Sequence, residues 1–153
     1  TARDSAHRRL VDLLDRGQPL PIDLCGQIIY YAGPTPARPG RPIGSCGPTT
    51  SSRMDAFAPR LLACGLKMMI GKGQRSPEVI QAIQSSRAVY CAAIGGAGAK
   101  IAQCVTASEI VAYEDLGPEA IRRLTVELLP VVVINDTLGD DLYHAARQEY
   151  RAG

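Results

Sequence analysis

The chain contains no tryptophan and only one phenylalanine among its 153 residues. It also lacks any run of lysines and arginines interleaved with aromatic side chains, and its formal net charge is only +2. Nucleic-acid-binding surfaces usually combine a concentrated positive charge with aromatic rings that stack on bases. We therefore expect no nucleic acid as a partner, and any positive charge that matters must be local.

Long apolar runs are absent as well. No stretch approaches the uninterrupted apolar length of a membrane span, and no signal-peptide pattern opens the chain. These absences predict a cytoplasmic protein with no membrane association. The chain begins at Thr1 rather than at methionine, and a helical pattern follows almost at once. We expect a single domain over residues 1–153 that lacks an N-terminal segment.

Paired cysteines are missing too. The five cysteines form no C-x-x-C pair, and only two histidines are present; the cysteines are Cys25, Cys46, Cys64, Cys91 and Cys104. An odd number of scattered cysteines predicts free, mostly buried thiols in a reducing compartment. The spacing resembles neither a zinc site nor a cluster motif, so we expect no metal ligands on this chain.

What the sequence does contain is an alternation of helical and strand-like segments. Helical patterns cover residues 4–16, 51–64, 76–86, 117–124 and 140–153, with a further short helix ending near Val105. Apolar, β-forming runs cover 27–33, 66–70, 88–94, 108–113 and 126–136, and residues 43–47 predict a short strand. With 46% hydrophobic residues, this alternation predicts one layered α/β domain.

The stretch "SCGPTTSSRMDA", residues 45–56, places a Gly-Pro turn, four hydroxyl side chains and Arg53 at an expected helix start. Free amides, the helix dipole and a guanidinium converge there, which suits an anion. If the helix begins near Thr49, then Thr49 and Arg53 share a face. The alternative is an ordinary helix cap followed by a solvated arginine.

Two other cations stand at positions that suit a ligand. Lys72 lies between two glycines just after an expected strand, where a turn presents its ammonium at the strand's carboxyl end. Arg3 precedes the first helix, where a positive charge opposes the dipole; the alternative is a solvent-exposed side chain. "MMIGKG" does not match a Walker A motif, and "GGAGAK" does not match a dinucleotide fingerprint.

Taken together, these pieces resemble a known family. The motifs that carry the resemblance span nearly the whole chain and are, in order, "ARDSAH", "IIYYAGPTPARPG", "IGSCGPTTSSRMD", "IGKGQRS", "AAIGGAGA" and "AYEDLGPEAIRRL". They look like the β subunit, or fused C-terminal domain, of class I iron–sulfur fumarate hydratases, with L-tartrate dehydratase β subunits as close relatives. The segments "GGAGA" and "AYEDLG" are more similar to the fumarase branch. The resemblance implies a swivelling three-layer β/β/α domain.

The resemblance also implies a function. It predicts reversible hydration of fumarate to L-malate at a [4Fe-4S] cluster that the partner α subunit or N-terminal domain holds, in a higher oligomer. Carried onto matching positions, it implies that Arg3, Arg53 and Lys72 bind the dicarboxylate and that Thr49 is catalytic. An L-tartrate dehydratase β subunit and a non-catalytic anion-binding α/β module remain the alternatives.

Overall fold

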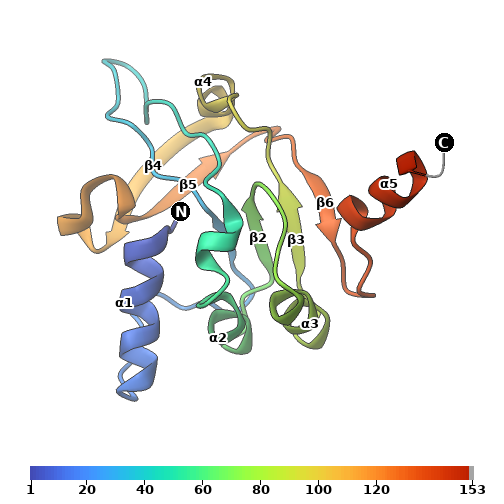
Figure 1. The fold of residues 1–153 in the computed structure, drawn as a ribbon. Helices are drawn as coiled ribbons and strands as arrows, with labels where there is room; N and C mark the ends of the chain where they lie inside the picture. The colour runs from blue at the N-terminus through green and yellow to red at the C-terminus, as the bar shows by residue number, and fades with distance from the viewer. Residues whose placement is uncertain (152–153) are drawn as a thin grey trace.

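The computed structural model describes residues 1–151. Its elements, in chain order, are α1 (Asp4–Asp15), β1 (Ile28–Tyr30), η1 (Ser51–Met54), α2 (Ala58–Ala63), β2 (Met68–Gly71), α3 (Pro77–Ser85), β3 (Val89–Ala92), α4 (Gly98–Ile101), η2 (Ala102–Cys104), β4 (Val105–Ala112), η3 (Glu114–Glu119), β5 (Ile121–Val126), β6 (Val132–Asn135) and α5 (Leu142–Arg151). Helices and strands alternate through most of the chain, so the predicted α/β class is confirmed (Figure 1).

A four-stranded sheet of order β1-β2-β3-β6 forms the centre of the molecule. β1, β2 and β3 are parallel, and β6 runs antiparallel to β3. β1 is joined to β2 by the segment that contains η1 and α2, and β2 to β3 by α3. The carboxyl ends of the three parallel strands therefore meet at one edge of the sheet.

The three parallel strands are largely buried on both faces because their side chains alternate between two apolar clusters. On one face, Ile29, Met69 and Tyr90 pack with the apolar residues of α1, α2 and α3. On the other face, their neighbours Tyr30, Ile70 and Cys91 pack with residues of α4 and the start of β4. This arrangement places α1, α2 and α3 on one side of the sheet, and α4 with the β4–β5 hairpin toward the other.

The hairpin is a separate two-stranded antiparallel sheet. It corrects the predicted helix over 117–124, because Pro118 belongs to η3 and Ile121–Val126 forms β5. Arg122 and Arg123 pair with Ile110 and Glu109 of β4, and the Arg123 guanidinium lies 2.9 Å from the Glu109 carboxylate. Pairing with a distant strand overrides the weak local preference for a short helix.

Other boundaries also differ from the prediction. Residues 43–47 form no strand, and the predicted helix 51–64 is divided into η1 and α2. Pro59 lies in the first turn of α2, where its missing N–H needs no partner, so it helps to begin a helix rather than bend one. The predicted strand 126–136 is likewise broken: β5 ends at Val126 and β6 begins at Val132, after Pro130.

The first turns of α3 and α1 are capped in different ways, one by a local residue and the other by a distant one. The Ser76 hydroxyl caps α3 by accepting from the Val79 amide at 3.4 Å. In contrast, α1 is not capped by Asp4 or Ser5; Arg3 is its N-cap residue, and the Glu119 carboxylate accepts from the Ser5 amide at 2.8 Å. The first turn of α1 is thus satisfied by a residue from η3.

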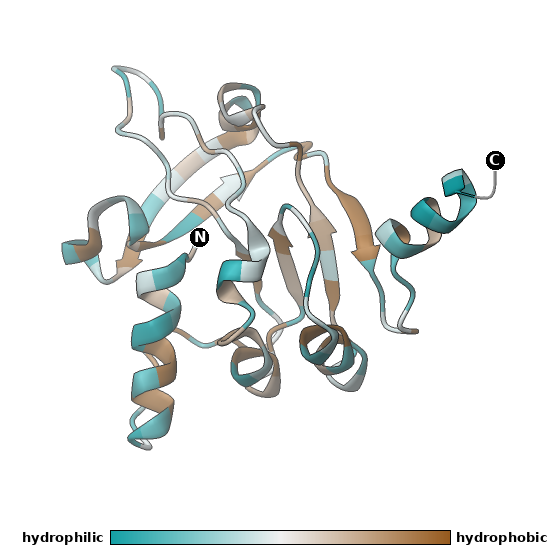
Figure 2. Cartoon of the chain, in the orientation of Figure 1, coloured by the Kyte–Doolittle hydropathy of each residue, from teal (hydrophilic) through white to brown (hydrophobic). Residues whose placement is uncertain are grey.

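The C-terminal tail is helical, as predicted, through Arg151; Ala152 and Gly153 lie outside the described residues. α5 projects away from the other elements, and Figure 2 shows it mostly hydrophilic beside the hydrophobic strands of the sheet. Along residues 1–151, none of the helices has the length and apolar character needed to cross a bilayer.

Candidate functional site

The carboxyl edge of the parallel strands gathers all four residues that the sequence singled out. The Ala2 amide donates to the carbonyl of Tyr30, the last residue of β1, which places Arg3 at this edge. The Thr49 amide donates to the carbonyl of Tyr31, and Lys72 directly follows β2. Ligands of open α/β sheets bind at this edge, where the chain leaves the strands and turns into loops.

Arg3 crosses the backbone of Gly33, and the absence of a side chain there is required. A Cβ added to Gly33 would lie 3.1 Å from Arg3 Nη1 and 2.9 Å from the Pro118 carbonyl. The Arg3 side chain is only 23% exposed, and its Nε is buried without a hydrogen-bond partner among the described residues. The alternative of a solvent-exposed Arg3 is therefore not what the structure shows.

Asp4 joins the two arginines. Its Oδ1 accepts from Arg53 Nε at 2.8 Å, and its Oδ2 lies 3.6 Å from Arg3 Nη2. Glu119 lies 3.6 Å from the same Arg3 nitrogen. Because Asp4 engages Arg53 through Nε, the two Nη groups at the end of the guanidinium remain as donors that a ligand could use.

Thr49 does not lie on a helix. The helical turn begins at Ser51, so the expectation that Thr49 and Arg53 share a helical face is wrong. Thr49 instead follows the buried Pro48 and is fixed by its amide, 2.6 Å from the Tyr31 carbonyl. Its side chain is half-buried. The ordinary-cap alternative also fails, because the N-cap residue Thr50 makes no side-chain capping hydrogen bond.

Lys72 is fixed to the same segment. Thr50 and Lys72 form a parallel bridge, in which the Ser51 amide donates to the Lys72 carbonyl at 2.9 Å. The Lys72 amide donates to Ser51 Oγ at 3.1 Å. The Lys72 side chain extends past Gly95, where an added Cβ would lie 3.5 Å from Lys72 Cδ. Thr49 and Lys72 are therefore held in register by Thr50 and Ser51, the two residues that follow Thr49.

The structure thus brings the predicted residues to one edge in two connected pairs: Arg3 with Arg53 through Asp4, and Thr49 with Lys72 through the Thr50 bridge. Sequence reasoning did not identify Asp4, Ser51 or Glu119 as members of this constellation. The "RD" pair before a helix was the available signal for Asp4. Nothing in the local sequence indicates Glu119, which comes from a segment more than 100 residues away.

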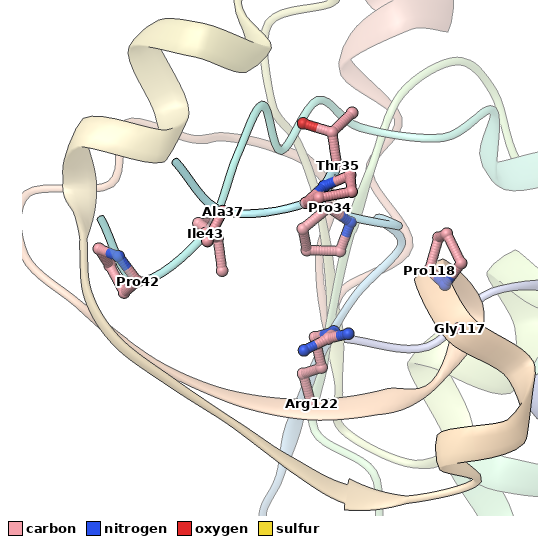
Figure 3. A pocket seen from close by; sticks show the side chains of 9 residues that line it. Pro34, Thr35, Ala37, Pro42, Ile43, Gly117, Pro118 and Arg122 are labelled. Atoms are coloured by element: carbon pink, nitrogen blue, oxygen red, sulfur yellow. The ribbon is translucent and has the colours of Figure 1, made fainter. Parts of the chain in front are cut away.

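A cavity of about 280 Å³ adjoins this edge (Figure 3). The proline-rich loop of residues 34–43 forms one wall, and Gly117, Pro118 and Arg122 form the other. Pro118 connects the cavity to the cationic edge, since its carbonyl faces Gly33 beside Arg3. The cavity wall is mostly apolar, so the charged chemistry belongs to the open edge rather than to the cavity.

The cysteines do not form a metal centre. Cys46 and Cys91 are buried, Cys25 is exposed, and none of the five is in a disulfide within residues 1–151. The same residues contain no group of three or more histidine, cysteine or acidic side chains that could hold a metal ion. Burial raises the pKa of the Cys46 thiol to about 11, so it remains protonated. The side chains of residues 1–151 therefore do not fit an iron–sulfur cluster.

Three cations and a hydroxyl around one edge suit a small anion with two charged ends. Guanidinium groups bind carboxylates through paired hydrogen bonds, and an ammonium supplies a point charge with freer geometry. Asp4 and Glu119 orient Arg3 and Arg53 without occupying every donor, because each guanidinium carries five N–H groups. The edge is open to solvent, so a second surface is needed to exclude water from a ligand bound there.

Comparison with known proteins shows which family the chain belongs to. Residues 1–146 match the family model described as the fumarase C-terminus. The mitochondrial fumarate hydratase 1 of Leishmania major is 40% identical over 144 residues, which cover 93% of this chain and 26% of that protein. The anaerobic class I fumarate hydratase of Escherichia coli (strain K12) is 41% identical over 143 residues, 92% of this chain and 26% of that protein.

A separate subunit is also similar. The putative L(+)-tartrate dehydratase subunit beta of Methanocaldococcus jannaschii is 33% identical over 155 residues, covering 97% of this chain and 80% of that subunit. The chain thus spans about a quarter of the length of the fumarate hydratases and most of the length of the smaller subunit. On the family model and these relatives, the chain belongs to the fumarase C-terminal domain family.

Proposed function

We propose that this chain is the β half of an iron–sulfur-dependent hydro-lyase that reversibly hydrates fumarate to L-malate. The observation that carries the proposal is the joining of Arg3 and Arg53 through Asp4, at the same sheet edge as Thr49 and Lys72. Its identity of about 40% to fumarate hydratases of two organisms supports this choice of substrate.

In this proposal the three cations bind the substrate carboxylates. Removing a proton from the carbon next to a carboxylate of malate pushes negative charge into that carboxylate. Cations fixed in place before the reaction stabilise this charge without rearranging, which lowers the barrier. Arg3 and Arg53 set the angle of the carboxylates through their planar groups, and Lys72 adds charge at the end of β2.

Thr49 holds the proton that moves between the enzyme and the substrate carbon. An isolated threonine hydroxyl is too weakly acidic to ionise, so it needs a base beside it. Asp4 is engaged by Arg53 at 2.8 Å and is therefore unsuited to this task. We assign the activating base to the partner region that closes over the open edge.

The partner in this proposal is the α subunit or N-terminal domain, which holds the [4Fe-4S] cluster. The five cysteines of this chain do not form a binding set for it, and we derive no step through the cluster. We further propose that the complex is a higher oligomer and works in the cytoplasm, a reducing compartment that suits five free thiols.

The test is reconstitution. The chain is co-expressed with the cluster-bearing region under anaerobic conditions, and fumarate formation from L-malate is followed by absorbance. We expect turnover only when both parts are present. A complex that binds malate without turnover would instead support the anion-binding module.

Tartrate is the second candidate substrate, because the similar Methanocaldococcus jannaschii protein is a separate subunit of comparable length. The same complex is therefore assayed with L-tartrate. Tartrate carries a second hydroxyl, and a site built to hydrogen-bond that hydroxyl strongly rejects a substrate without it. A ratio of kcat/KM that favours malate supports fumarase activity, and the reverse ratio supports tartrate dehydratase activity.

A further inference from the structure

Arg75 is a buried cation that the proposed reaction does not use. It lies in the turn between Lys72 and α3, and none of its side chain is exposed to solvent. Its guanidinium carbon lies 5.3 Å from the centre of the Tyr31 ring and 5.0 Å from that of Tyr90. A charge removed from water at this depth is costly unless its surroundings compensate for it.

The compensation comes from the segment that carries Arg53. Arg75 Nε donates to Asp55 Oδ1 at 2.8 Å, and Nη1 donates to the Tyr31 hydroxyl at 3.2 Å. The other Asp55 oxygen accepts from the Ser76 amide at 2.7 Å. Burial alone would lower the pKa of Arg75, but the Tyr31 oxygen and the Asp55 carboxylate outweigh it and raise that pKa. Arg75 therefore stays charged.

A second set of hydrogen bonds ties the Lys72 turn to the same segment. The Tyr90 hydroxyl donates to the Gly73 carbonyl at 2.8 Å and lies 2.8 Å from Ser51 Oγ. The tyrosine has one hydroxyl proton, so Ser51 must donate to the Tyr90 oxygen. Ser51 Oγ in turn accepts from the Lys72 amide at 3.1 Å. The turn is thus held at both its amide and its carbonyl groups.

Both sets connect the same two pieces of chain. Asp55 lies two residues after Arg53, and Ser51 lies two residues after Thr49. On the other side, Gly73 follows Lys72 directly, and Arg75 is three residues farther on than Lys72. The buried contacts therefore determine where the Thr49–Arg53 segment lies relative to the Lys72 turn.

We propose that Arg75 is a positioning residue that holds Arg53 and Lys72 at the separation needed to grip both ends of a dicarboxylate. The inference rests on the proposed function and deepens it. A buried ion pair is weak support for stability, since apolar replacements of similar size are often as stable. A shift of about 1 Å in a group that orients a substrate costs roughly 100-fold in rate, so fixed geometry is the stronger reason for this arrangement.

The test uses Arg75→Lys in the reconstituted complex. Lysine keeps the charge but has no planar fork to bridge Asp55 and Tyr31. We expect kcat/KM for malate to fall roughly 10- to 100-fold through both a higher KM and a lower kcat. The matched control is Arg60→Lys, because Arg60 also pairs with an aspartate at 2.8 Å but is 50% exposed. Its kinetics should match the wild type.

A readout specific to positioning comes from inhibitors. Succinate has two carboxylates and does not react, whereas butyrate has one. We expect Arg75→Lys to weaken succinate inhibition about tenfold and to leave butyrate inhibition unchanged, since only the two-ended grip depends on the separation of the cations. A general loss of structure would weaken both inhibitors alike and would overturn the inference.

Tyr90→Phe keeps the inference testable if Arg75→Lys does not fold. It removes one hydroxyl and keeps the ring, and Tyr150→Phe, at an 86% exposed position, is its control. We expect Tyr90→Phe to lower kcat/KM for malate and to weaken succinate inhibition less than Arg75→Lys does, and to leave butyrate inhibition unchanged. Hydrogen exchange of the Lys72 amide should become faster. Wild-type kinetics, wild-type succinate inhibition and unchanged exchange in these variants would overturn the inference. A wild-type complex without turnover would instead overturn the proposed function, and the exchange measurement would still decide the role of Arg75.

Discussion

Thr49 shows how a backbone contact determines the position of a reactive side chain. A helix that began near Thr49 would place Thr49 and Arg53 on one face, but in the structure Thr49 precedes η1, and its amide lies 2.6 Å from the Tyr31 carbonyl. The hydroxyl is therefore not needed for capping. It is available at the sheet edge, which strengthens its proposed role in proton transfer.

Replacement of Thr49 by alanine tests that role. We expect Thr49→Ala in the reconstituted complex to reduce kcat by roughly 100-fold or more, the size typical of a lost acid–base group. Steady-state turnover of malate measures this. The adjacent variant Thr50→Ala is the control, because Thr50 is exposed and only its backbone pairs with Lys72. Equal turnover in the two variants would remove Thr49 from the mechanism.

The proposed binding of a substrate carboxylate by Arg53 depends on its planar, forked guanidinium group and not on its charge alone. Its Nε is occupied by Asp4, and a lysine has no second edge to offer a carboxylate. We expect Arg53→Lys to lower kcat/KM about 10- to 100-fold, the range for a lost charge-assisted hydrogen bond. Arg8→Lys, at an exposed position of α1, should keep wild-type kinetics. If Arg53→Lys also keeps wild-type kinetics, then the forked guanidinium of Arg53 is not needed for substrate binding.

The burial of His7 predicts how the free energy of unfolding depends on pH. It is fully buried, its Nδ1 lies 2.9 Å from the Arg3 carbonyl, and its Nε2 has no partner among the described residues. Burial lowers its pKa from 6.5 to about 4, with smaller contributions from Arg75, which lowers it, and Asp4, which raises it. Between these values the unfolded state binds the proton and the folded state does not.

The contribution of His7 to the free energy of unfolding should therefore be complete above pH 6.5. It should be lost as the pH falls toward 4, by up to about 3 kcal/mol. Urea unfolding at several pH values measures the free energy of unfolding. His7→Asn should remove most of this slope, whereas His144→Gln, on the exposed face of α5, should keep it. A slope that survives in His7→Asn would assign the acid sensitivity to other groups.

At the scale of elements, the site depends on how closely β2 approaches η1. Gly71 ends β2, and a Cβ there would overlap Ser51 Oγ and lie 2.9 Å from the Tyr31 ring. Both atoms are in buried residues that cannot move aside cheaply. Glycine at this position is what allows Ser51 to reach the Lys72 amide.

We expect Gly71→Ala to destabilise the fold by about 1–3 kcal/mol, the usual cost of overpacking, and to raise KM by displacing Lys72. Thermal unfolding and malate kinetics measure the two effects. Gly47→Ala is the control, since its nearest added contact, Gly98 Cα at 3.5 Å, is an ordinary van der Waals distance. A well-folded Gly71→Ala with unchanged KM would contradict this account of the edge.

Sequence patterns predicted the elements whose signals are local. The apolar spacing of α1, the Ser76-Pro77 start of α3 and the β-branched and apolar runs of β2 and β3 all identified their elements. The patterns failed at 43–47 and 117–124, where pairing with distant residues decides the conformation. β5 is a strand because β4 is beside it, and no window of its own sequence contains that information.

At the scale of the whole molecule, our proposal makes this site one half of an active site that a partner region completes. Its cations lie on an open edge, and the thiols of this chain are dispersed between buried and exposed positions. A cluster held by a partner region should therefore be independent of these thiols. Replacing the cysteines therefore tests which part of the complex holds the cluster, which no single active-site variant can do.

We expect the variant with all five cysteines replaced by alanine to assemble with its partner and to keep the full iron–sulfur absorbance and electron paramagnetic resonance signal. Alanine is chosen because a serine hydroxyl at the buried positions 46 and 91 would lack a partner. Iron content per complex measures the result. Loss of the cluster in this variant would place at least one of its ligands on this chain.

The sequence by itself determined the α/β class and the family, because composition, periodicity and ordered motifs are properties of the linear chain, and the same motifs predicted the four proposed site residues. Only the tertiary structure decided that Asp4 joins Arg3 to Arg53, that Glu119 caps α1 and that Arg75 locks the Lys72 turn to Asp55. These contacts join residues brought together by parallel strands and their crossovers. Their energies depend on burial and on distances of a few ångströms, which no local sequence pattern encodes.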